Sequence, residues 1–240
     1  MLFDIVYYKT LPSSNNEAIR LASADAPEGT VVVCCEQTAG RGQRNNCWVS
    51  APGENLTMSL ILRPADIAAD ELFLLSKAFS LAVVRSLNCY GINASIKWPN
   101  DIYAETRKIA GILIEHSFWG NDLMFSVVGL GLNVNQVSFP PLDIVPTSMV
   151  AETGKDYYDI NEILSSILNC FSSSYKSDKE TIHNGYMEKL YRRKGCFPYR
   201  TKNGEMLVAE IHNVASSGEL ILKDVNGVFN SFLFKEITYL

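Results

Sequence analysis

Two arginines and two glycines stand in one short polar run, Gly40-Arg41-Gly42-Gln43-Arg44, directly after a strand-like segment. Arginine grips a carboxylate or phosphate through paired hydrogen bonds, and exposed backbone N–H groups add further donors. The run therefore predicts a loop that binds a small anion. A surface loop with solvated charges is the alternative, because short glycine patterns have a high false-positive rate.

The same run nearly matches the dinucleotide fingerprint G-x-G-x-x-G. A Rossmann site is excluded by context, because residues 45–53 make a poor helix and Asn45 stands where the third glycine is required. The chain also lacks the P-loop pattern G-x-x-x-x-G-K-[ST] and the serine hydrolase pattern G-x-S-x-G.

A second group of candidate residues lies further along the chain. Asn100 and Asp101 supply oxygen atoms on a tight bend, which suits Mg²⁺ shared with a substrate phosphate. An Asx turn at the end of a strand is the alternative.

Lys108 begins an apolar strand and faces the glycine-containing segment 129–133, where a ligand can approach the backbone closely. A lysine that only reaches out to solvent is the alternative reading there.

Composition narrows the classes of partner. The chain has 240 residues, 47% of them hydrophobic, and a net charge of −5, which argues against a nucleic-acid surface. Its apolar runs are short of the roughly 18 residues that cross a bilayer, and the N-terminus lacks a signal-peptide pattern. Six cysteines without regular spacing and three isolated histidines predict free thiols, a cytoplasmic location and no zinc site.

The elements that must position these residues alternate along the chain. We expect helices at 15–24 and 70–89, strands at 30–36 and 56–62, a hairpin of strands 108–118 and 123–134 about a turn at 119–122, and two helices within 156–191. Ser13 or Ser14 should cap the first helix. A turn centred on 120–121 places Lys108 opposite Asn133 and Gly111 near Leu130.

Short strands with asparagine–glycine and serine–glycine turns follow residue 191. We therefore expect two domains, an α+β domain at 1–190 and a small all-β domain at 191–240.

Taken together and in this order, the motifs resemble the biotin protein ligases. The matching elements are Ser13-Ser14-Asn15 with Ala18, Gln37–Gly42 with Trp48, Asn55-Leu56 with Ser59, Lys97–Asp101 (KWPND), Lys108–Glu115 (KIAGILIE), Gly129–Asn135 (GLGLNVN) and the segment from Tyr191 to Ile237. The resemblance implies an α+β fold, with a mixed sheet flanked by helices of the class II synthetase-like, biotin–lipoate ligase-like type. It also implies a small C-terminal SH3-like β-barrel.

The resemblance implies a two-step reaction in which ATP converts biotin to biotinyl-5′-adenylate and a lysine of a biotin carboxyl carrier domain then takes the acyl group. Lys108, Arg41 and Asp101 would be catalytic. The biotin site would comprise Ser13, Ser14, Asn15, Gln37, Arg41, Gly42, Gln43, Lys108, Gly111 and Gly129, with Gly131 also leaving room for the valeryl chain. ATP would meet Arg41, Arg44, Trp48, Asn100, Lys108 and Asn133, and Mg²⁺ would lie at Asn100 and Asp101.

The chain departs from the family pattern at Ser14, Gln43, Asn45 and Asn46, the last three in the polar segment that follows the strand at 30–36. It starts directly with the catalytic domain, so we expect a ligase without DNA binding, either a monomer or a weak homodimer. A lipoate–protein ligase, a non-catalytic biotin or adenylate sensor and a generic α+β binding module are the alternative functions.

Overall fold

The computed structural model describes residues 1–43, 46–141 and 144–240, and its main element is a seven-stranded mixed sheet. The strand order is β1-β2-β3-β7-β6-β5-β4, in which β1 and β2 are parallel and the other neighbours are antiparallel. The bounds are β1 Asp4–Leu11, β2 Thr30–Gln37, β3 Asn55–Leu62, β4 Ala94–Lys97, β5 Asp101–Ala104, β6 Arg107–Trp119 and β7 Asp122–Asn133. The helices are α1 Ser14–Ser23, α2 Phe73–Cys89, α3 Met149–Thr153, α4 Ile160–Tyr175 and α5 Lys179–Glu188, with a 3-10 turn at Ala69–Glu71.

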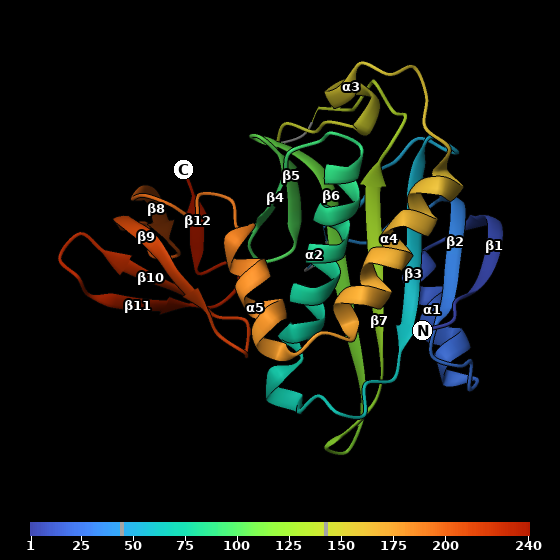
Figure 1. The fold of residues 1–240 in the computed structure, drawn as a ribbon, viewed down its shortest axis with the longest axis horizontal. Helices are drawn as coiled ribbons and strands as arrows, with labels where there is room; N and C mark the ends of the chain where they lie inside the picture. The colour runs from blue at the N-terminus through green and yellow to red at the C-terminus, as the bar shows by residue number, and fades with distance from the viewer. Residues whose placement is uncertain (44–45, 142–143) are drawn as a thin grey trace.

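The two faces of the sheet are covered differently (Figure 1). Side chains alternate between faces along a strand. Val31 and Val33 accordingly join the large core beneath α2 and α4, whereas Val32 joins a small core beneath α1. Helix α1 covers only part of its face, so the remainder of that face is left for a cavity.

The expected helices at 15–24 and 70–89 and strands at 30–36, 56–62, 108–118 and 123–134 are confirmed, with ends shifted by at most three residues. Strands β1, β4 and β5 and helix α3 were not predicted. The capping prediction is right in its position and wrong in its acceptor, because Ser13 occupies the N-cap position of α1 but its side chain makes no cap hydrogen bond. The Ser14 N–H instead donates to Gln37 Oε1 at 2.7 Å, so a side chain from β2 satisfies the start of the helix.

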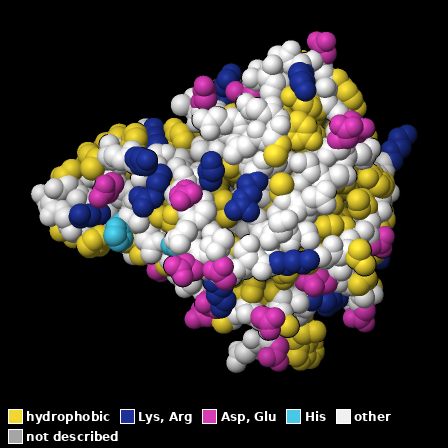
Figure 2. All heavy atoms as spheres, in the orientation of Figure 1, with side chains coloured by type: hydrophobic (Ala, Val, Ile, Leu, Met, Phe, Trp, Pro, Cys, Tyr) yellow, Lys and Arg dark blue, Asp and Glu magenta, His cyan; other side chains and the backbone are white. Residues whose placement is uncertain are grey.

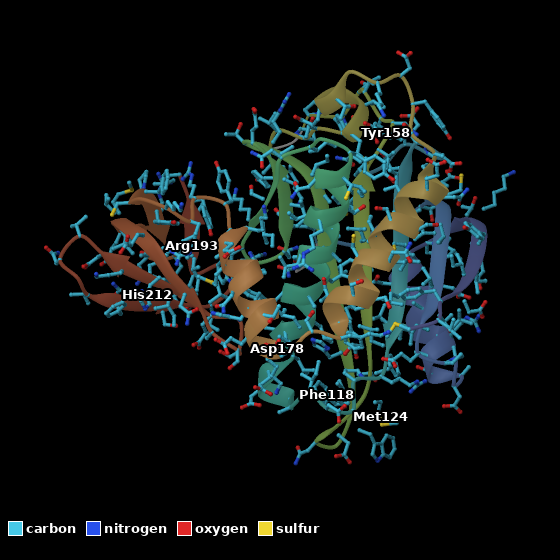
Figure 3. The ribbon with its side chains drawn as sticks, in the orientation of Figure 1. Phe118, Met124, Tyr158, Asp178, Arg193 and His212 are labelled. Carbon is cyan, nitrogen blue, oxygen red and sulfur yellow. The ribbon has the colours of Figure 1, made fainter. Side chains whose placement is uncertain are left out.

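The predicted hairpin register is correct beside its turn and wrong beyond it. Trp119 pairs with Asp122, as a turn centred on 120–121 requires. Met124 is then an extra residue in β7, between the partners of Phe118 and Ser117, and this β-bulge shifts every later pair by one (Figure 3). As a result Gly111 faces Gly131, not Leu130.

The chain after α5 forms a separate five-stranded antiparallel sheet of order β11-β10-β9-β8-β12. Its strands are β8 Phe197–Thr201, β9 Met206–Val214, β10 Leu220–Asp224, β11 Phe229–Phe232 and β12 Ile237–Tyr239. Arg193, in the connection, donates to the carbonyl of Ile211 at 2.6 Å (Figure 3). Trp98 Nε1 donates to the carbonyl of Gly218 at 2.9 Å, and this bond ties the new sheet to the first one.

The segment Ala69–Cys89 is long and apolar enough to cross a membrane by length and composition. Of its most apolar window, however, 72% is buried inside the fold, beneath the first sheet and against α4 and α5. That burial is typical of a core helix. Figure 2 shows acidic and basic side chains interspersed over the face that carries α2 and α4, without a continuous basic surface there.

Lys77 on α2 is a buried cation that joins the helix to the C-terminal sheet. It is 3% exposed, and its amine donates to the carbonyls of Val214 at 2.8 Å and Ala215 at 3.1 Å. His183 Nδ1 lies 3.1 Å from the same amine. Burial lowers the pKa of Lys77 to about 8, because desolvation disfavours the charged form.

This depressed pKa makes stability depend on pH in a defined direction. Between pH 8 and 10 the unfolded chain retains a proton on Lys77 that the folded protein has released, so stability rises with pH through that window. Relative to Lys77→Met, the wild type should gain about 1–2 kcal/mol between pH 7.5 and 9.5. Urea unfolding of both proteins at each pH measures the difference, and parallel pH profiles would contradict this assignment.

Candidate active site

A cavity of about 510 Å³ opens on the α1 face of the first sheet, beside the N-terminus of α1. Its walls come from the start of α1, the loop after β2, the strands β6 and β7, and the segment before and within β12. The lining residues include Ser13, Ser14, Asn15, Gln37, Arg41, Gly42, Gln43, Trp48, Lys97, Asn100, Asp101, Lys108, Gly111, Leu113, Gly129, Gly131, Phe234, Lys235 and Tyr239. Most of the residues predicted for the site are thus brought together.

The first turn of α1 forms one end of the cavity. Ser13, Ser14 and Asn15 are buried, and the Ser59 hydroxyl lies 2.8 Å from Ser14 Oγ and 2.5 Å from Asn15 Oδ1. A helix N-terminus presents partly positive N–H groups. This end is therefore suited to polar, oxygen-bearing ligand groups.

Lys108 and Asp101 form an ion pair at the floor of the cavity. Lys108 Nζ lies 2.6 Å from Asp101 Oδ1, and the two side chains are 17% and 22% exposed. A β-bulge at Ile109 makes the pair possible, because Tyr103 pairs with Lys108 while Asp101 pairs with Gly111. Residues two apart on β5 share a face, so the extra residue brings Lys108 to the same face as Gly111.

Trp48 lies against the glycines of β6 and β7. A Cβ atom on Gly131 would be 2.2 Å from Trp48 Cε2, and one on Gly111 would be 3.2 Å from Cζ3. A Cβ atom on Gly129 would similarly meet Asn15 Oδ1 at 2.1 Å. The glycines were expected to leave room for a ligand chain. In this structure that room holds Trp48 and Asn15.

Arg41 lines the cavity from the loop after β2. Its Nη2 donates to Glu115 Oε1 at 2.5 Å, and its Nη1 donates to Asn16 Oδ1 at 2.5 Å. Gly42 and Gln43 also line the cavity. The predicted ATP contact Arg44 and the departure at Asn45 lie outside the described residues.

Asn133 does not line the cavity as the structure stands. It is 4% exposed, and its Nδ2 donates to the carbonyl of Thr147 at 2.9 Å. Its Oδ1 is buried without a hydrogen-bond partner, and so is Trp48 Nε1. Such orphaned polar atoms are costly unless a ligand or water meets them.

Sequence analysis missed the contribution of the C-terminal sheet and of Lys97. Lys97 Nζ donates to Tyr103 Oη at 2.9 Å and lies 5.3 Å from the centre of the Tyr239 ring. Desolvation lowers the pKa of Lys97 and raises the pKa of Tyr103 to about 12. The motif KWPND was the available signal for Lys97. Lys235 lies in the C-terminal segment that resembles the family, but that resemblance did not predict that Lys235 or Tyr239 would face the cavity.

The predicted metal ligands Asn100 and Asp101 each keep one side-chain oxygen for a metal. Asn100 Nδ2 donates to the carbonyl of Ile112 at 2.9 Å, which leaves its carboxamide oxygen, and Asp101 retains Oδ2 beside its pair with Lys108. Among the described residues no group of three or more His, Cys, Asp or Glu side chains gathers as a metal site. Two oxygens fit a Mg²⁺ that arrives with substrate phosphate, which needs few protein ligands.

Fold and site together define a class of α+β proteins with a cavity, lined by arginine and lysine side chains, on one face of a mixed sheet. Residues 8–133 match the Biotin/lipoate A/B protein ligase family, and the chain belongs to that family. A "Biotin--[acetyl-CoA-carboxylase] ligase" from Paracoccus denitrificans is 31% identical over 227 residues, which cover 90% of this chain and 92% of that protein.

A "Bifunctional ligase/repressor BirA" from Bacillus spizizenii is 38% identical over 176 residues. That match covers 72% of this chain, which spans about half (54%) of the relative's length. Among solved structures, the biotin protein ligase from Aquifex aeolicus matches with a TM-score of 0.77 at 23% identity, covering 100% of this chain and 99% of the other. This likeness confirms the α+β fold.

The close fit of Trp48 on Gly131 yields a structural prediction. Gly131→Ala places a methyl group where the rigid indole lies, so Trp48 should move toward solvent. The fluorescence of Trp48, taken as the difference from a Trp48→Phe variant, should shift to longer wavelength and become more accessible to acrylamide. Gly185→Ala is the control, since its new methyl group meets only the ends of two flexible side chains, Leu81 at 3.3 Å and Arg85 at 3.8 Å. An unchanged Trp48 signal in Gly131→Ala would contradict the contact.

Proposed function

We propose that this chain uses ATP to attach biotin to a lysine of a biotin carboxyl carrier domain, through biotinyl-5′-adenylate. The observation that carries the proposal is that Arg41 and Lys108, from a loop and a strand far apart in the sequence, line one cavity. The relative from Paracoccus denitrificans, which is named for the same reaction and matches over nearly its whole length, supports it.

The chemistry explains why two cations are needed. In the first step a biotin carboxylate oxygen attacks the α-phosphorus of ATP, forming the acyl-adenylate and releasing pyrophosphate. In the second, a lysine amine attacks the acyl carbon, forming an amide and releasing AMP. Bringing the two anions together is unfavourable unless fixed positive charge neutralises them, and preorganised cations supply this at little further cost.

The roles follow the position of each residue around the cavity. Lys108 would hold the carboxylate and α-phosphate oxygens, and Arg41 would hold the carboxylate and the developing adenylate. Asp101 would orient Lys108 through the 2.6 Å ion pair. The biotin head group would meet the polar end of the cavity formed by Ser13, Ser14, Asn15, Gln37, Gly42 and Gln43, beside Gly111 and Gly129.

The orphaned atoms support an adenine site beside the glycines. Trp48 Nε1 is a donor without an acceptor, and Asn133 Oδ1 is an acceptor without a donor. The exocyclic amine of adenine can donate to Asn133 Oδ1, and Trp48 can stack on the adenine face while its in-plane N–H remains for another acceptor of the nucleotide. Mg²⁺, which neutralises phosphate charge when bound with ATP, would be held by Asn100 and Asp101.

The acceptor side of the reaction can be argued from the free edge of β6. Strand β5 pairs with β6 only as far as Gly111, and among the described residues no strand pairs with that edge from Leu113 onward. A groove of about 480 Å³ lies beside it, lined in part by Phe73, Ile114 and Phe118, and shares Asn100 and Phe234 with the main cavity. We infer that the carrier domain brings its lysine to the reaction centre here.

We further propose a catalytic domain at 1–190 and an SH3-like β-barrel at 191–240, whose segment around Lys235 and Tyr239 helps to seat the nucleotide. Both residues line the cavity, which supports that role. A cytoplasmic location, the absence of a nucleic-acid or membrane partner, and a monomer or weak homodimer remain the predictions made from sequence.

One assay tests the proposal against its closest alternative. The protein is incubated with ATP, Mg²⁺, either biotin or lipoate, and a carrier domain, while ATP–pyrophosphate exchange and acyl transfer are measured. Biotin-dependent exchange and transfer are expected. No exchange would refute the enzyme, and preference for lipoate would establish a lipoate ligase in its place.

Lys108→Ala should lower the rate of adenylation by about 10²–10³, the cost of losing one preorganised electrostatic group. The pre-steady-state rate of adenylate formation measures this effect, and a thermal melt checks that the unpaired Asp101 has not unfolded the protein. Lys9→Ala, an exposed lysine on β1, is the control and should retain the wild-type rate. Equal rates in the two variants would remove Lys108 from the reaction.

A further inference from the structure

Glu115 stands at the centre of a hydrogen-bonded group that joins four elements of the site. Its two oxygens have different partners: Oε1 accepts from Arg41 Nη2 at 2.5 Å and Oε2 accepts from Asn15 Nδ2 at 2.9 Å. Through Asn15 the group continues to Ser59 on β3, and through Arg41 to Asn16 on α1. Glu115 therefore links Arg41, in the loop after β2, to Asn15 at the start of α1.

We infer that Glu115 is a positioning residue, which holds Arg41 and Asn15 in the orientation that binds biotin; the inference rests on the proposed function. Glu115 lies on β6 two residues after Leu113, so it shares the face of the sheet on which the cavity lies. It is not among the residues that line the cavity, and neither is Asn16. Both therefore contact Arg41 from outside the cavity.

Arg41 keeps N–H donors for a substrate while it is bound to Glu115 and Asn16. A guanidinium group carries five N–H donors in a rigid fork. One is used by Glu115 and one by Asn16, which leaves three for an anion in the cavity. Arg41 is half-exposed, on a loop after β2, and these two contacts fix its side chain at the rim.

The carboxylate is chemically specific in this place. Both partners of Glu115 are donors, and an ionised carboxylate has two acceptor oxygens. Glutamine has one acceptor oxygen and one donor NH₂ group. Its oxygen can accept a hydrogen bond from only one of the two partners, and its NH₂ group would face a donor of the other partner. Aspartate keeps both acceptors on a side chain that is one methylene group shorter.

The first test compares Glu115→Gln with wild type in biotin-dependent ATP–pyrophosphate exchange. The KM for biotin should rise about tenfold with kcat changed less than about threefold, and Glu115→Asp should fall between the two proteins. Glu17→Gln is the matched control, because Glu17 also pairs with an arginine, but that arginine, Arg20, does not line the cavity whereas Arg41 does. A wild-type KM in Glu115→Gln would overturn the inference.

A double-mutant cycle with Arg41→Ala separates positioning from a general structural effect. If Glu115 acts through Arg41, Glu115→Gln should raise the KM for biotin much less in the Arg41→Ala background than in wild type. Equal effects in both backgrounds would show that Glu115 does not act through Arg41 and would overturn the inference.

A readout independent of activity keeps this inference separate from the proposed function. In the free protein, Glu115→Gln should be cleaved by trypsin after Arg41 several times faster than wild type, while Glu17→Gln is cleaved at the wild-type rate. Mass spectrometry of the fragments identifies the bond. Faster cleavage in a protein that lacks biotin-dependent exchange would support the anchoring and refute the proposed function. Unchanged cleavage in an active enzyme would overturn the anchoring alone.

Discussion

The ion pair between Lys108 and Asp101 is the interaction on which the site depends. A lysine at the floor of a cavity is unfavourable unless a partner compensates its lost hydration, and Asp101 at 2.6 Å provides that compensation. The pair exists because Ile109 is an extra residue between two ladder pairs of β5 and β6. A local irregularity in the sheet thus turns the amine toward the cavity while the apolar neighbours of Lys108 stay in the core.

The other parts of the site surround the Lys108 amine. Three glycines on β6 and β7 flatten one face of the sheet, and Trp48 and Asn15 lie closely against them. The start of α1 and Arg41 add further donors, and Glu115 links the two. The C-terminal sheet is held beside the cavity by Trp98 and by the buried amine of Lys77. Arg41, Trp48 and the start of α1 thus place donors and a flat apolar surface toward one cavity.

The sequence predicted residues that belong to local motifs. It did not predict positions that depend on contacts between residues far apart in the chain. The helices, the central strands and the cavity residues around Arg41, Asp101 and Lys108 could be predicted from spacing and from the resemblance to the biotin protein ligases. The bulges at Ile109 and Met124 could not, because neither residue type marks an extra position in a strand. For the same reason the hairpin register was predicted one residue out, and Gly111 faces Gly131.

Two further features were beyond sequence reasoning. Asn133 was expected to contact the nucleotide, yet its side chain is buried beside the cavity and bound to the Thr147 carbonyl, a contact set by the chain after β7. Lys235 and Tyr239 lie about a hundred residues after the motif Gly129–Asn135, and only the packing of the C-terminal sheet brings them to the cavity. The family resemblance gave the general location of the site, whereas the neighbours of each side chain came from the fold.

The most direct measurement of the central claim is the identity of the molecule that the protein retains. The protein is mixed with biotin, ATP and Mg²⁺ in the absence of a carrier domain, passed through a desalting column, and analysed by native mass spectrometry. The account predicts a protein that carries one biotinyl-5′-adenylate, which a carrier domain then discharges to AMP and biotinylated lysine. Recovery of the protein without an adenylate, or with unreacted biotin and ATP alone, would contradict it.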